Sequence, residues 1–65
     1  TMYHAKVMQR METGEVVCLR EFRNADPDVA EDRACEWIND RDLDNQYPES
    51  EFFVDLEREG SYYVE

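Results

Sequence analysis

The sequence has few of the residues on which enzyme chemistry depends. It contains one histidine and two cysteines, and the cysteines do not stand at a spacing typical of a metal or redox site. No nucleophile, base and orienting group can be assembled into a catalytic set, so we expect a protein that is not an enzyme and has no cofactor. Cys18 and Cys35 are expected to be buried free thiols, with a disulfide between them as the alternative.

Positive charge and long hydrophobic runs are also scarce. Seven Lys and Arg residues stand against 17 Asp and Glu residues, which gives a formal net charge of −10. Because recognition of phosphates needs clustered Lys and Arg, we expect no direct binding to nucleic acid. No apolar run is long enough to span a bilayer or resembles the core of a signal peptide, so we expect a cytoplasmic protein without membrane contact.

Internal repeats, low-complexity segments and interdomain linkers are absent as well. The 65 residues are therefore expected to form one small domain, 1–65, with a core too small to enclose a large cleft. Hydrophobic residues make up 42% of the chain and aromatic residues 12%. This content argues against intrinsic disorder, although 37% of the residues are charged.

The strongest signal that is present predicts a helix over residues 26–42. Asp26 can cap this helix with its carboxylate, and Pro27 suits the first helical position, where a missing N–H costs nothing. An apolar stripe follows at helical spacing: Ala30, Ala34, Trp37 and Ile38. We expect the stripe to pack on a sheet, which the alanines allow the helix to approach closely.

Residues 2–22 are predicted to form a β-hairpin. The first strand alternates between two faces, and residues 12–14 have the form of a three-residue hairpin loop with Gly14 in the left-handed position. With this loop, Val7 faces Leu19 across the two strands. The face that receives the helix then consists of Ala5, Val7, Val17 and Leu19, with Val54 and Leu56 from the last part of the chain.

The opposite face of the sheet has no predicted cover, since one helix covers only one face. In the register just given, this open face carries a largely apolar set: Met8, Val16, Cys18, Phe22, Phe53 and Tyr63. A slip of one residue would instead turn Val16, Cys18 and Phe22 toward the helix. The sequence leaves both registers open.

The last third of the chain is predicted to return to the sheet. Residues 43–50 are polar, contain Pro48 and are expected to form a loop. Residues 52–65 form either one long strand or a hairpin, in which 61–65 is a fourth strand. The sequence therefore predicts the α+β class, with a single helix packed on one face of a small antiparallel sheet in the order β-β-α-β(-β).

One acidic segment resembles the calcium-binding loop of the EF-hand family. Its carboxylates match the first, third, fifth and twelfth positions of such a loop: Asp40, Asp42, Asp44 and Glu51. Asn45 stands where that family has a glycine, Pro48 occupies another loop position, and the segment that follows is more strand-like than helical. The resemblance implies a calcium-binding domain, and the alternative is a solvated acidic loop without a metal.

Acidic residues also predict a surface for a protein partner. The outward face of the helix and the loop after it would carry one acidic ridge: Glu31, Asp32, Glu36, Asp40, Asp42 and Asp44. A larger protein with a basic surface is the expected partner, because opposite charge speeds association. Met8 and Phe22 on the open sheet face are the expected apolar contacts. The alternative is a charged surface that serves only solubility.

A hairpin, a helix and a strand in a chain of this length and acidity resemble the small inhibitors that bacteriophages and mobile elements make against host nucleic-acid machines. These include RNA polymerase inhibitors and anti-CRISPR proteins. The resemblance implies a non-enzymatic viral protein that inhibits such a machine by imitating nucleic acid. Besides the calcium-binding domain, one further alternative is a structural subunit that forms a homodimer through the open sheet face or the Phe53/Tyr63 edge.

Overall fold

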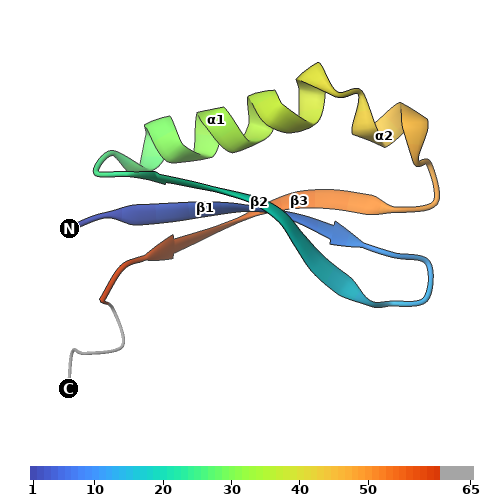
Figure 1. Cartoon of the computed structure of the whole chain (residues 1–65), viewed down its shortest axis with the longest axis horizontal. Helices are drawn as coiled ribbons and strands as arrows, with labels where there is room; N and C mark the ends of the chain where they lie inside the picture. The colour runs from blue at the N-terminus through green and yellow to red at the C-terminus, as the bar shows by residue number, and fades with distance from the viewer. Residues whose placement is uncertain (61–65) are drawn as a thin grey trace.

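The computed structural model describes residues 1–60, which form a three-stranded sheet with one long helix on one side (Figure 1). The elements in chain order are β1 (Tyr3–Arg10), β2 (Val16–Asn24), α1 (Pro27–Asp40), α2 (Leu43–Gln46) and β3 (Glu51–Arg58). Both strand pairings are antiparallel, and the spatial order β2-β1-β3 places the first strand in the middle. The predicted α+β class is confirmed. The predicted fourth strand at 61–65 lies outside the described residues.

Helix α1 begins where the sequence predicts and buries the predicted stripe. Asp26 accepts a hydrogen bond from the Asp28 N–H at 2.9 Å, which satisfies one of the unpaired donors at the helix start. The buried residues of α1 lie on the stripe, and half-buried Trp37 packs against the same core: Ala30, Ala34 and Ile38. No helix in the described part of the chain is long and apolar enough to cross a membrane.

The segment after α1 differs from the prediction at two points. α1 ends at Asp40 rather than at residue 42, because Asp42 adopts a left-handed conformation with φ of 53°. Residues 43–50, predicted as a loop, begin with the short helix α2. Leu43 packs against the core, and this inward contact holds α2 in place. Because the segment is mostly polar, the sequence alone did not indicate that Leu43 would attach it to the core.

The loop of the first hairpin has the predicted form. Gly14 has φ of 97°, a conformation that residues with a side chain rarely adopt. The Met11 N–H donates to the Glu15 carbonyl at 2.8 Å, and the Gly14 N–H donates to the Met11 carbonyl at 2.8 Å. These bonds close the three-residue loop and fix the register of the adjoining strand ends.

A β-bulge in β2 then divides the hairpin into two registers. Near the loop, Met8 pairs with Cys18, as the first predicted register requires. One step further on, Val7 pairs with Arg20, and Leu19 is passed over in the pairing. The extra residue shifts the pairing by one position, so the side chains in the remainder of β2 point to the opposite faces from those of the first predicted register. Each predicted register is therefore correct for one half of the strand.

The bulge exchanges two hydrophobic side chains between the faces. Phe22, predicted on the open face, pairs with Ala5 and packs against the core beneath α1. Leu19, predicted in the core, is 39% exposed. The prediction is also wrong for Leu56, which is 39% exposed at the outer strand, whereas Val54 packs against the core as expected.

Alanine substitutions at Phe22 and Leu19 distinguish the bulged register from an uninterrupted one. Phe22→Ala should lower the free energy of unfolding by roughly 2–4 kcal/mol, because it removes a large, partly buried ring from the core. Leu19→Ala should cost less than about 1 kcal/mol, because that side chain is 39% exposed and lies outside the core. Urea denaturation of both variants measures the difference. A larger loss for Leu19→Ala than for Phe22→Ala would mean that β2 has no bulge.

Candidate functional site

The two helices and their connections form an acidic layer, defined here as residues 26–49. This segment holds nine carboxylates and two arginines, so its formal charge is −7 of the total of −10. Every acidic residue predicted for the ridge is exposed: Glu31, Asp32, Glu36, Asp40, Asp42 and Asp44. The layer lies on the side of the molecule opposite to the open sheet face, because α1 and α2 both lie on one side of the sheet (Figure 1).

Within the acidic layer the carboxylates lie in two different places, on the outer side of α1 and beside a groove. An outer row repeats every four residues, about 6 Å along the helix axis: Asp28, Asp32, Glu36 and Asp40. Glu31 and Asp44 instead line a groove between α1 and β3. Five residues of the predicted ridge thus divide between the outer row and the groove rim, and Asp42 belongs to neither. Asp28 was missed as a member of the row, although its four-residue interval to Asp32 is visible in the sequence.

The acidic layer differs from the open sheet face in how its charges are paired. Within residues 1–60, all the ion pairs lie on or beside the sheet: His4–Glu21, His4–Glu59, Lys6–Glu57, Arg10–Glu51 and Arg23–Glu59. No carboxylate of the acidic layer takes part in one. Arg41 of the layer lies over the Trp37 ring at 4.1 Å and donates to the Trp37 carbonyl. The unneutralised negative charge is therefore concentrated on the helix side.

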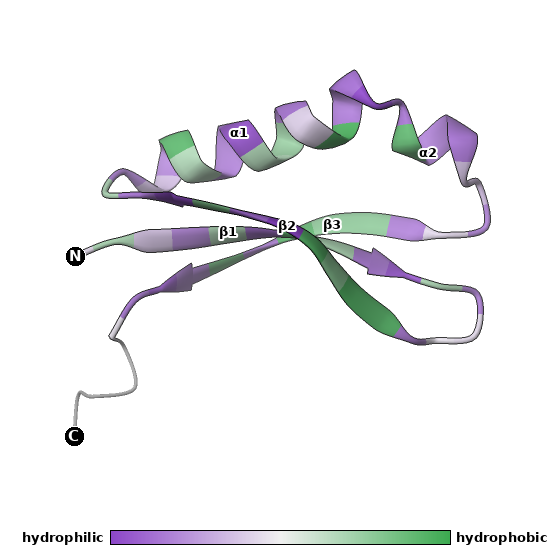
Figure 2. Ribbon diagram, in the orientation of Figure 1, coloured by the Kyte–Doolittle hydropathy of each residue, from purple (hydrophilic) through white to green (hydrophobic). Residues whose placement is uncertain are grey.

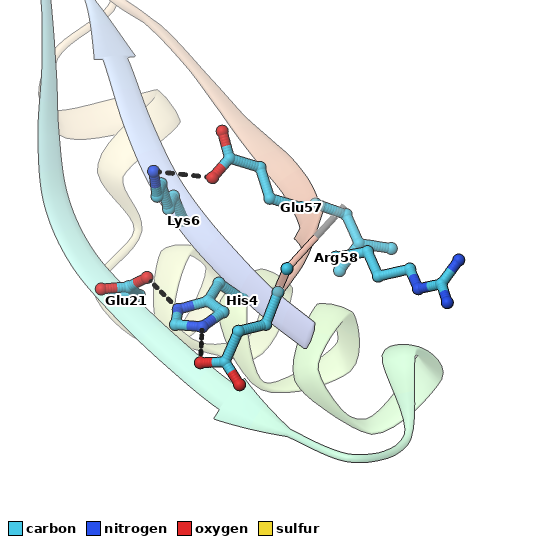
Figure 3. A pocket seen from close by; sticks show the side chains of 8 residues that line it. His4, Lys6, Glu21, Glu57 and Arg58 are labelled. Carbon is cyan, nitrogen blue, oxygen red and sulfur yellow. Dashed lines mark hydrogen bonds and ion pairs between the residues drawn. The ribbon is translucent and has the colours of Figure 1, made fainter. Parts of the chain in front are cut away.

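His4 is the centre of a cluster of ion pairs at one end of the open sheet face (Figure 3). Its Nε2 lies 3.1 Å from the Glu59 carboxylate, and its Nδ1 contacts Glu21 of β2. Arg23 donates to the same Glu59 carboxylate at 3.2 Å. The cluster joins β1 and β2 to the residue that follows β3.

Protonation of the cluster follows from these contacts. Hydrogen bonds that the Glu59 and Glu21 carboxylates accept raise the pKa of His4, because both ring nitrogens can donate only in the charged imidazolium. Arg23 and then His4 lower the pKa of the Glu59 carboxyl. The cluster is therefore fully charged only in a window between the titrations of Glu59 and His4.

A second ion pair continues the pattern along the sheet. Lys6 Nζ lies 3.0 Å from Glu57, and this contact raises the pKa of the lysine. Sequence reasoning missed these pairs, although their signal is an alternation with period two. Basic residues occupy positions 4, 6 and 10 of β1, and acidic residues occupy positions 51, 55 and 57 of β3.

The other half of the open sheet face, toward the hairpin loop, is mainly apolar and carries the Arg10–Glu51 ion pair at its end. In Figure 2 the hydrophobic part of β2 lies toward the hairpin, and its other part is mostly hydrophilic. Met8 pairs there with Cys18 on one side and with Phe53 on the other, and Arg10 lies over the Phe53 ring at 5.0 Å. Met8 is where the sequence predicts, whereas Phe22 belongs to the core. Tyr63 lies outside the described residues.

The structure does not gather the four carboxylates of the predicted calcium loop. Asp40 ends α1, Asp44 lies in α2, and the Asp42 carboxylate accepts a hydrogen bond from Asn45 at 2.8 Å. Glu51 begins β3 and forms an ion pair with Arg10. Among residues 1–60, no three His, Cys, Asp or Glu side chains are arranged to hold a metal ion. The calcium alternative therefore has no geometric support in this part of the chain.

The two cysteines are free and exposed, which corrects the prediction that they are buried. Cys18 is paired with Met8, four residues along β1 from His4, or about 13 Å at 3.3 Å per residue. This separation keeps the thiol away from the imidazole. At Cys35, partial burial and then the charges of Glu31 and Asp32 raise the pKa of the thiol. A raised pKa disfavours the nucleophilic thiolate.

Replacement of His4 by glutamine should lower the melting temperature more at about pH 5.5 than at about pH 8. The folded-state pKa of His4 is raised above its ordinary 6.5, so its stabilising contribution is fully present below that value and is lost as the pH rises through the raised pKa. The Glu59 contribution is present above the ordinary 4.5 and is lost as the pH falls through its lowered pKa.

Thermal denaturation of both proteins from about pH 4 to 9 measures this window. Lys6→Gln is the matched control, because the pKa of Lys6 is raised from its ordinary 10.5 and its charge should not change between about pH 5.5 and 8. An equal loss for His4→Gln at both pH values would show that the cluster contributes nothing through its charge.

Known proteins give no further guide to the function of these surfaces. No protein-family model, no curated protein and no solved structure matches the chain. The distribution of charge and the exposed strand edges of the described residues are therefore the features that bear on function.

Proposed function

We propose that this chain is a non-enzymatic protein-binding module that docks through its acidic layer, residues 26–49. Its partner is a larger protein with a basic groove that normally holds nucleic acid. The module occupies the groove and excludes the nucleic acid by competition, as an inhibitor of a host nucleic-acid machine would. No chemical step is involved.

The observation that carries this proposal is the segregation of charge between the two sides of the molecule. Four carboxylates on the sheet side are paired with His4, Lys6, Arg10 and Arg23: Glu21, Glu51, Glu57 and Glu59. Within the described residues, the carboxylates on the helix side have no such pairs. Surface charges that serve solubility alone need no such separation. A concentrated, unneutralised surface instead supplies the long-range field that steers a basic partner.

The charge density of α1 supports a comparison with a nucleic-acid strand. The 14 residues of α1 extend about 21 Å at 1.5 Å per residue. They carry five carboxylates and one arginine, which gives one net negative charge per roughly 5 Å. A single DNA strand carries one charge per about 3.4 Å of helix axis, and a duplex carries one per about 1.7 Å. The helix therefore resembles one strand more closely than it resembles a duplex.

Burial keeps this surface in place. Ala30 and Ala34 are fully buried against the sheet. This packing fixes the rotation of α1 about its axis, so the opposite side of the helix always faces solvent. Asp26 and Asp28 also stabilise the start of the helix, where negative charge interacts favourably with the helix dipole. The acidic row is consequently presented on a rigid element, and binding does not require the row to become ordered.

Charge reversal in the outer row should weaken the competition with nucleic acid. We expect the double variant Asp32→Lys/Glu36→Lys to displace labelled single-stranded DNA from a basic channel roughly tenfold less effectively, chiefly through slower association. Bacterial RNA polymerase core and Cas9 are the two test proteins, and fluorescence anisotropy of the DNA is the measurement. Displacement by the unmodified chain from at least one of them should fall steeply with added salt.

The matched control reverses two exposed carboxylates in the first hairpin, Glu12→Lys/Glu15→Lys, so the change in net charge is identical. This control should displace DNA nearly as well as the unmodified chain. Both double variants should keep the melting temperature nearly unchanged, because the four positions lie on the surface. Equal weakening by both variants, or no displacement from either protein, would contradict the proposal.

A further inference from the structure

A second surface lies at the outer edge of β3, apart from the outer row of the acidic layer. We propose that this edge, with the groove between β3 and α1, binds an extended peptide segment of a partner as an additional β-strand. The segment alternates basic and apolar residues. This inference does not depend on how the acidic layer is used.

The backbone of β3 offers regular hydrogen-bonding groups along that edge. β3 pairs with β1 over its whole length without a shift in register. The Glu59 N–H donates to the Met2 carbonyl at 2.8 Å, and bonded pairs alternate with non-bonded pairs in an antiparallel ladder. The N–H and C=O groups of Phe52, Val54 and Leu56 are therefore directed away from β1. Among the described residues, no strand pairs with them.

The other edge of the sheet is less suited to the same role. The outer strand there is β2, and its bulge at Leu19 interrupts the spacing of the outward backbone groups. Bulges of this kind are one way in which proteins prevent a further strand from adding to an edge. The β3 edge has no such protection in the described structure.

Side chains that an added strand turns toward α1 would enter a groove lined by both hydrophobic and polar residues. The groove is lined by hydrophobic residues of the helix and of β3, with polar groups at its rim: Cys35, Ile38, Phe52, Phe53, Val54 and, at the rim, Glu31, Asn39 and Asp44. Phe52 and Val54 pack only partly against the core, which leaves surface for a partner's side chains. We therefore expect apolar residues at every second position of the segment.

Side chains that the strand turns the other way would meet carboxylates. Glu51, Asp55 and Glu57 occupy the open-face positions of β3. Glu51 and Glu57 already pair with cations of β1, and Asp55 takes part in no ion pair among the described residues. Opposite charges on neighbouring strands attract, so lysine or arginine is expected at the intervening positions of the segment.

This charge pattern also argues against the other occupants. An antiparallel pairing of β3 with a second copy would bring two acidic strands together, and like charges directly opposite are destabilising. The last five residues of the chain, 61–65, contain no basic residue. A basic partner segment is the occupant that complements the edge.

The direct test uses a fluorescent peptide with the sequence Lys-Val-Arg-Ile-Lys-Val-Arg, capped at both ends. A peptide of the same composition with its apolar residues grouped together tests for unspecific attraction. A third peptide carries N-methyl groups on alternate residues, which removes the hydrogen bonds that a strand would donate to β3. At about 0.15 M salt, surface charges beyond roughly 8 Å are screened.

We expect saturable binding of the alternating peptide and at least tenfold weaker binding of the grouped and N-methylated peptides. In the protein, Leu56→Pro should weaken binding at least tenfold relative to Leu56→Ala. Proline removes the outward N–H at that position and is tolerated on an edge strand. Both variants remove the same exposed side chain, and circular dichroism confirms that each is folded.

Three results would overturn the inference. The first is equal binding of the N-methylated and unmodified peptides, and the second is no saturation up to about 1 mM peptide, the limit of weak recognition. The third is binding only to a chain that ends at Gly60, because residues 61–65 would then be the natural occupant. The variant Asp32→Lys/Glu36→Lys should bind the peptide within about twofold of the unmodified chain at this salt concentration, so failure here is separable from failure of the acidic layer to dock.

Discussion

The structure depends on the contact between small side chains of α1 and the central strand. Ala30 and Ala34 of the helix and Ala5 and Val7 of β1 are all 0% exposed, and Val7 is the largest fully buried side chain in the described chain. Alanine at the interface lets the helix backbone approach the sheet closely, which compensates for the small number of large core residues. A single helix cannot cover a second face of the sheet. This contact therefore decides which sheet face stays open and which side of α1 faces solvent.

Two different surfaces result from that constraint. On the open sheet face, residues of alternating charge lie on adjacent strands and neutralise one another, as His4 does between Glu21 and Glu59. On the helix side, the apolar stripe uses the inward positions, and acidic residues occupy most of the outward ones. The polarity of the molecule thus arises from sequence periodicity: two along the strands and 3.6 along the helix.

Most of the fold could be predicted because these periodicities are regular. The cap at Asp26, the stripe from Ala30 to Ile38 and the turn at Gly14 each have a local cause in the sequence, and each is present in the structure. The β-bulge could not be predicted in the same way. Residues 18–20 contain neither glycine nor proline, and the effect of the bulge is to place Phe22 rather than Leu19 against the core.

The sequence was enough to predict which acidic residues are exposed, but not how they are arranged relative to β3. The exposure of the acidic helix face followed from the position of the apolar stripe. Its division into an outer row and a groove rim at Glu31 and Asp44 depends on β3 lying beside β1, which no local pattern specifies. The β3 edge, with which no strand of residues 1–60 pairs, depends on the same long-range pairing. Such neighbours are determined by packing of the whole chain rather than by any segment of it.

Carboxylate footprinting of a complex shows which side of the molecule contacts the partner. The chain is bound to the basic-channel protein from which it displaces DNA, its carboxylates are modified with a carbodiimide and an amine, and the modified sites are identified by mass spectrometry. If the acidic layer docks, Asp32 and Glu36 are protected from modification in the complex, while Glu12 and Asp55 react as they do in the free chain. Protection of Asp55 with full reactivity of Asp32 and Glu36 would contradict docking through the acidic layer and would assign the contact to the sheet side.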